Sequence, residues 1–115
     1  ITLITSTFFS RDTAQQYENE LNSLQHDALK MSPNDIIAAI KGMKERKDRL
    51  KLFQSCHLPK MVVLGKNDRI INFELQQSYY HNTDIDIVEL SNGHMSHIEN
   101  MKVFTYNIIR FIEKI

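Results

Sequence analysis

The sequence predicts an α/β fold, in which the strands of a parallel sheet alternate with helices that cover it. Residues 60–64 hold four consecutive apolar side chains between a proline and a glycine, and residues 85–90 begin with alternating apolar and polar side chains. Short apolar runs of this kind are typical of strands buried in a parallel sheet. Segments with helical spacing precede, separate and follow these runs, which favours a parallel sheet with helices on its faces.

The N-terminal segment predicts one more strand and a polar helix. Residues 1–6 are rich in Ile and Thr, which favours a strand, and residues 7–10 should form a loop. Residues 11–30 have sparse apolar positions at helical spacing, which predicts a helix that mostly faces solvent. The chain opens on Ile1 without a methionine, and an exposed edge strand needs a partner, so we expect further polypeptide upstream.

A clear helix start follows at Ser32. Ser32 is suited to be the N-cap, Pro33 lies in the first turn, and Asp35 carries a negative charge where the helix dipole favours one. This helix should extend to about Arg46. The charged residues 47–52 predict a turn or a short further helix.

The C-terminal half predicts a strand between two helices. Residues 73–81 should form a helix, and residues 85–90 the strand after it. Residues 99–115 should form the closing helix, which would pack through one apolar stripe. This stripe consists of Met101, Phe104, Ile108, Phe111, Ile112 and Ile115.

Composition restricts the function classes. The 115 residues carry a formal net charge of zero, with acidic and basic residues interleaved, so nothing argues for a nucleic-acid partner. The apolar runs are too short to span a membrane, and the start lacks the features of a signal peptide. Cys56 is the single cysteine, which fits a protein of the reducing cytoplasm. We therefore expect one globular cytoplasmic domain without a membrane partner.

Two chemistry-bearing residues follow the two predicted C-terminal strands. Asp68 comes in the turn after residues 60–64, and His94 comes 26 positions later in the turn after residues 85–90. Because the carboxyl ends of parallel strands meet at one edge of a sheet, we expect the two side chains to lie within hydrogen-bonding distance. Such a histidine can act as a general base, and the carboxylate then fixes its tautomer and stabilises the imidazolium.

The turns that carry these residues resemble those of the α/β-hydrolase family. Gly65-Lys66-Asn67-Asp68 is similar to the G-x-x-D turn that supplies the triad acid, and Gly93-His94 opens a G-H-x-x-x-x-E turn that supplies the triad histidine. By this resemblance Asp68 is the acid, His94 is the base, and Glu99 is the acid that opens the last helix. The resemblance implies the last three strands of the hydrolase sheet and part of a helical lid.

The resemblance also implies a division of the chain and a function. Residues 1–10 would be a core strand and loop, residues 11–52 a helical lid that returns to the core, and residues 53–115 the C-terminal core. The complete enzyme would hydrolyse an ester or related acyl bond of a small-molecule substrate through a Ser-His-Asp triad, without a cofactor or metal.

The serine of such a triad is not found in this chain. The family places it in a G-x-S-x-G turn, and none of Gly42, Gly65 and Gly93 flanks a serine in that way. We therefore expect the nucleophile on the N-terminal half of the same protein, and this chain alone to be inactive. Two alternatives stay open: a non-catalytic binding or receptor protein, and a dehalogenase or lyase of the same fold.

Two rival sites are less favoured by the pattern. His94, His97 and Glu99 are candidate metal ligands, but the histidines are three positions apart, and zinc-binding helices more often space them by four. Cys56 is a candidate nucleophile, but it precedes a strand and would lie at the wrong end of the sheet.

Overall fold

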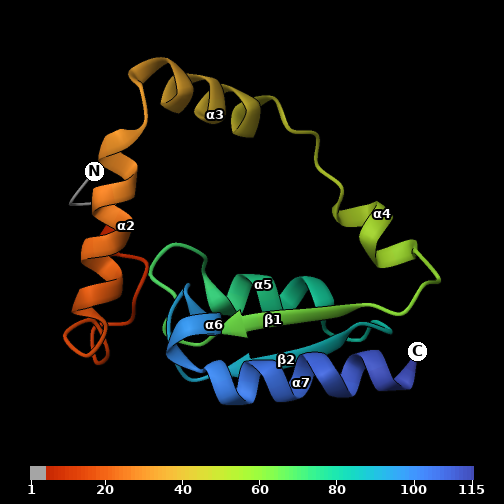
Figure 1. Cartoon of the computed structure of the whole chain (residues 1–115). Coiled ribbons are helices and arrows are strands. Elements are labelled where there is room, and N and C mark those ends of the chain that lie inside the picture. The colour runs from red at the N-terminus through yellow and green to blue at the C-terminus, as the bar shows by residue number, and fades with distance from the viewer. Residues whose placement is uncertain (1–4) are drawn as a thin grey trace.

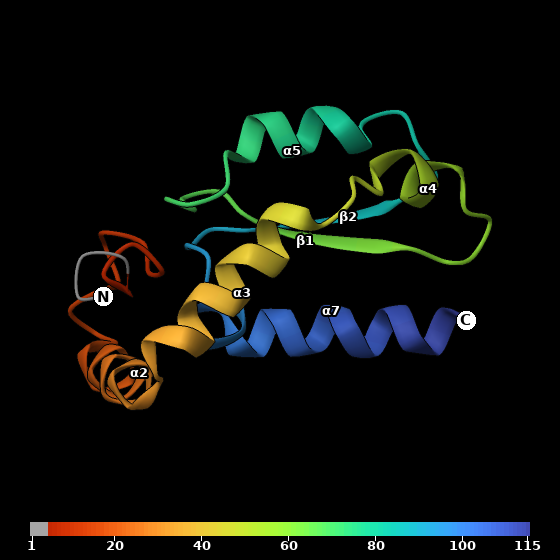
Figure 2. The ribbon, with the colours of Figure 1, turned by 90° about the horizontal axis from the view of Figure 1, so that it is seen from above.

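The computed structural model describes residues 5–115, which contain a small parallel sheet between two helices (Figure 1). Strands β1 (Met61–Gly65) and β2 (Asp86–Leu90) pair in parallel, with Met61 opposite Asp86 and Gly65 opposite Leu90. Helix α5 (Phe73–Tyr80) connects the strands, and α7 (Met101–Lys114) follows β2. Figure 2 shows α5 and α7 on opposite sides of the strands, so the sheet is covered on both faces.

The prediction of three strands from an α/β-hydrolase sheet is wrong for the described residues, whose only sheet has two short strands. Residues 1–4 of the expected first strand lie outside the described residues, and Thr5 belongs to a helical turn. The ring of buried Phe9 stacks on that of Tyr17, with centroids 5.6 Å apart. This packing joins the segment to Tyr17 and overrides the β preference of its Thr residues. The result is a helix-dominated domain with two parallel strands.

The region expected to be helical before the sheet contains α2 (Glu18–Lys30), α3 (Pro33–Glu45) and α4 (Leu50–Ser55). The helix expected from residue 11 begins only at Glu18, after a series of turns. The helix start at Ser32 is confirmed: its hydroxyl accepts from Asp35 N at 3.2 Å, and the Asp35 carboxylate accepts from Ser32 N at 3.3 Å. Neither α2 nor α3 has a buried residue, and α3 stands away from the sheet in Figure 1.

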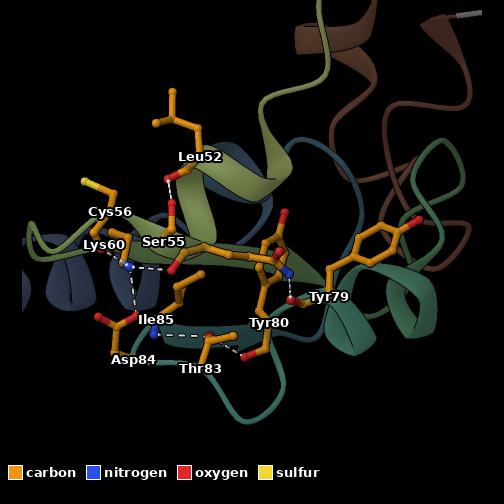
Figure 3. Close-up of polar contacts among 10 residues, drawn as sticks. Leu52, Ser55, Cys56, Lys60, Tyr79, Tyr80, Thr83, Asp84 and Ile85 are labelled. Carbon is orange, nitrogen blue, oxygen red and sulfur yellow. Dashed lines mark hydrogen bonds and ion pairs between the residues drawn. The ribbon is translucent and has the colours of Figure 1, made fainter.

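The buried side chain of Lys60 connects α4 to the N-terminal end of the sheet (Figure 3). The Lys60 side chain is only 4% exposed, and its ammonium group forms an ion pair with Asp84 at 2.8 Å. It also donates to the carbonyl oxygen of Gln54 at 3.2 Å and to that of Cys56. The hydrogen bond from Lys60 lowers the pKa of Asp84, because it stabilises the charged carboxylate.

The closing helix is preceded by a separate helical turn. The prediction placed its start at Glu99, but α6 (Ser96–Glu99) ends there, and Asn100, with φ of −129°, separates it from α7. Of the predicted apolar stripe, three residues (Phe104, Ile108 and Phe111) are half-buried and three (Met101, Ile112 and Ile115) are exposed. None of the helices within residues 5–115 has the length and apolar character needed to cross a membrane.

Candidate functional site

The turn after β1 presents Asp68 with its carboxylate already bound. Asp68 N donates to Gly65 O at 3.2 Å, which closes the turn. One carboxylate oxygen, Oδ1, accepts from the backbone N–H groups of Ile70 and Ile71 at 2.8 and 2.9 Å. The Asp68 side chain is 9% exposed. Its second oxygen, Oδ2, is therefore held in a fixed direction and remains for another partner.

That partner is His94, in the turn after β2. His94 Nδ1 lies 2.8 Å from Asp68 Oδ2, so the expected contact between the two side chains is present. A carboxylate at Nδ1 favours the tautomer with its proton on Nδ1, which leaves the lone pair of Nε2 free to accept a proton. The His94 side chain is 35% exposed, and no described residue forms a hydrogen bond with Nε2. The pair has the arrangement of a general base and the acid that orients it.

Two glycines allow the turns to approach each other closely. A Cβ atom at Gly65 would lie 2.3 Å from Gly93 O and 2.6 Å from Asn92 O, so only glycine fits. A Cβ at Gly93 would meet Ser10 N at 2.6 Å. The backbone also joins the turns, because Asn67 N donates to Asn92 O at 3.1 Å. These close approaches bring Asp68 and His94 within hydrogen-bonding distance.

Side-chain contacts link the turn after β1 to the sheet and to α5. Lys66, directly after β1, forms an ion pair with Glu89 of β2 at 2.9 Å. Gln77 of α5 donates to the other oxygen of that carboxylate at 2.6 Å. The hydrogen bond from Lys66 lowers the pKa of Glu89, because it favours the ionised form. The β1 turn is thus linked to both β2 and α5 beside the site.

A cavity of about 310 Å³ adjoins the Asp68–His94 pair. Its size is within the range of small-molecule sites. Its apolar wall comes from β1, from the loop and helix after it, and from α7; it consists of Val63, Leu64, Ile71, Phe73 and Phe104. The ring of Phe8 lies 6.1 Å from the ring of His94 and adds an aromatic neighbour beside the histidine. A polar pair beside an apolar wall can hold a substrate that has both kinds of group.

The rival sites are not assembled in residues 5–115. No three His, Cys, Asp or Glu side chains in this range are placed to hold a metal ion. The Glu99 carboxylate points to Gly93 N at 3.0 Å, and the His97 ring packs against Phe104, 6.3 Å between centroids. The backbone carbonyl oxygen of Cys56 accepts from Lys60 near the start of β1, whereas Asp68 follows the other end of that strand.

Comparison with known proteins adds no family to this description: a scan of the sequence against models of protein families gives no match, and neither does a search of curated proteins.

Proposed function

We propose that this chain supplies the acid and the histidine of a hydrolytic triad. The observation that carries the proposal is the 2.8 Å contact between Asp68 Oδ2 and His94 Nδ1, in which the acid is fixed by two further backbone hydrogen bonds. The complete protein would hydrolyse an ester or related acyl bond of a small molecule. Its serine would lie on the N-terminal half of the same protein.

Each residue of the pair has a defined role in this reaction. His94 Nε2 removes the proton from the serine hydroxyl as the oxygen attacks the acyl carbon, and Asp68 stabilises the imidazolium that forms. The proton then passes to the leaving alcohol, and an acyl-enzyme remains. In the second half His94 takes a proton from water, which attacks the acyl carbon, and the serine is released with that proton. These steps require no metal or cofactor.

The two alternatives differ from this proposal in the group that the N-terminal half of the protein would supply. In each of them Asp68 would remain the partner of His94, because Oδ1 accepts two N–H groups and Oδ2 faces the imidazole. An aspartate-nucleophile dehalogenase of this type would need another aspartate on the N-terminal half. A binding or receptor protein would keep the pair without a nucleophile.

The single cysteine also supports a cytoplasmic location for the protein.

Labelling with a fluorophosphonate serine probe tests the proposal on the full-length protein. We expect one adduct by intact mass, and at least about a 100-fold slower labelling of His94→Gln, because the serine then lacks its general base. His26→Gln is the matched control, since His26 is an exposed histidine on α2, and its labelling should not change. Absence of an adduct on the wild type would instead support a binding protein, and unchanged labelling of His94→Gln would refute the role of His94.

A further inference from the structure

Glu99 is a buried carboxylate that no cation neutralises. The residue is only 8% exposed, and it forms no ion pair with a Lys, Arg or His of residues 5–115. Its oxygens are instead occupied by hydrogen bonds from neutral groups: Oε1 accepts from Gly93 N at 3.0 Å, and Oε2 accepts from Ser10 N at 3.1 Å and from the Thr13 hydroxyl at 2.5 Å. Burying a carboxyl group is costly unless hydrogen bonds satisfy it, and these three bonds do so.

These bonds join the two segments that flank His94. Gly93 directly precedes His94 in the turn after β2. Ser10 lies two positions after Phe8, whose carbonyl oxygen accepts from Met95 N at 3.1 Å and whose ring lies 6.1 Å from the His94 ring. One carboxylate therefore binds both the backbone before His94 and the segment that lies beside its ring.

The contact leaves little freedom for the turn. A Cβ atom at Gly93 would lie 2.9 Å from Glu99 Oε1 and 2.6 Å from Ser10 N, so the three groups meet with almost no space between them. Without the carboxylate, the buried Gly93 N–H would lose its acceptor. The backbone would then shift toward water or another acceptor, because an unsatisfied buried N–H is unfavourable. His94, the next residue, would move with it.

We propose that Glu99 is a positioning residue for His94: it sets the direction of the imidazole toward Asp68 without touching the substrate. This inference rests on the proposed hydrolytic function for its kinetic consequence, but its structural part stands alone. A displacement of about 1 Å at a reacting group can lower the rate about 100-fold, so positioning through a single carboxylate has a measurable effect.

The test compares Glu99→Ala and Glu99→Gln with the matched control Thr13→Val in the full-length protein. Thr13→Val removes one donor from the same carboxylate but leaves the bond to Gly93 N. The ¹⁵N chemical shifts of the His94 ring report which nitrogen carries the proton. We expect the Nδ1–H tautomer in the wild type and in Thr13→Val, and a mixture of tautomers in Glu99→Ala.

The kinetic readout should follow the same order. We expect kcat to fall about 10- to 100-fold in Glu99→Ala with KM changed less than about threefold, and to fall less than about threefold in Thr13→Val. Glu99→Gln should recover part of the loss, because its amide oxygen can still accept from Gly93 N. If Glu99→Ala does not fold, the His94 tautomer and the kcat of Glu99→Gln test the positioning role instead.

The outcomes separate this inference from the proposed function. Wild-type ring signals in folded Glu99→Ala and Glu99→Gln, with a change only in thermal stability, would overturn the positioning role. A wild-type protein without hydrolytic activity would overturn the proposed function, while the tautomer comparison would still decide whether Glu99 positions His94.

Discussion

Replacing Lys60 with methionine tests whether its buried ammonium group holds α4 to the sheet. Methionine keeps most of the aliphatic stem but removes the donors to Gln54 O and Cys56 O. A hydrogen bond from a charged donor contributes about 1.5–3 kcal/mol, and loss of the ammonium recovers part of its desolvation cost. We therefore expect local unfolding of α4 to become easier by about 2–3 kcal/mol. The ion pair with Asp84 adds little to this free energy, because the Asp84 side chain is 64% exposed and water replaces its partner.

Amide hydrogen exchange measures this change where it occurs. The N–H groups of Phe53 and Cys56 form helical hydrogen bonds in α4, and their exchange should become about 30- to 150-fold faster, since 1.36 kcal/mol corresponds to a factor of ten. Lys30→Met is the matched control: its ion pair with Asp27 also measures 2.8 Å, but the Lys30 side chain is 62% exposed. Exchange in α2 should change by about twofold at most. Unchanged exchange in α4, or equal changes in α2 and α4, would refute the claim that the buried ammonium group of Lys60 stabilises α4 more than the exposed Lys30 stabilises α2.

The same variant should alter the acid dependence of stability. The pKa of Asp84 in the folded protein lies below its usual value of 3.8 because of the hydrogen bond from Lys60. A lowered folded-state pKa contributes stability above the unfolded pKa, and this contribution is lost as the pH falls through the folded pKa. The stability difference between wild type and Lys60→Met, from urea titrations, should therefore shrink slightly below about pH 4, because the exposed Asp84 carboxylate contributes only a small part of it. A difference that grows in acid would contradict this linkage.

Three further substitutions test the turns and the helix start. Asp68→Asn should slow fluorophosphonate labelling of the full-length protein about 10³- to 10⁴-fold, because an amide cannot hold His94 in the active tautomer; unchanged labelling would contradict the pairing. Gly65→Ala should lower the unfolding free energy by about 1–3 kcal/mol in urea titrations, because the new Cβ would lie 2.3 Å from Gly93 O; a stable variant would show that the turns can separate. Ser32→Ala should cost α3 about 1 kcal/mol, seen as faster exchange of its first-turn amides, whereas unchanged exchange would mean that the cap is not needed.

The contact between Asp68 and His94 could be expected from the sequence because local signals define it. Each residue comes just after a short apolar strand, and parallel pairing brings such ends together. Gly65 and Gly93 mark the turns in the sequence, and their role in the close approach is visible only in the structure. The helix start at Ser32 was likewise predictable, because the N-cap serine, the proline and the acid of the first turn lie close together in the sequence.

Several contacts that the sequence did not indicate are long-range. Glu99 meets Ser10 and Thr13 across 89 and 86 positions, and no local pattern marks these three residues as partners. The burial of Lys60 was also missed, because a lysine before an apolar run is usually exposed. The expected strand at residues 1–6 failed at Thr5, because β propensity is overridden by packing such as that of Phe9 on Tyr17.

The separation between Glu99 and its partners has a consequence for the order of folding. The sheet and α5 form from consecutive residues between Met61 and Leu90, so these contacts close short loops. The bonds from Ser10 and Thr13 to Glu99 close loops of more than 80 residues, whose entropy cost is larger and which form more slowly. We expect the sheet to assemble first and the segment around Ser10 to dock last. The histidine turn would then become rigid only in the final step, so a chain that has built its sheet would still hold His94 loosely until its N-terminal segment is in place.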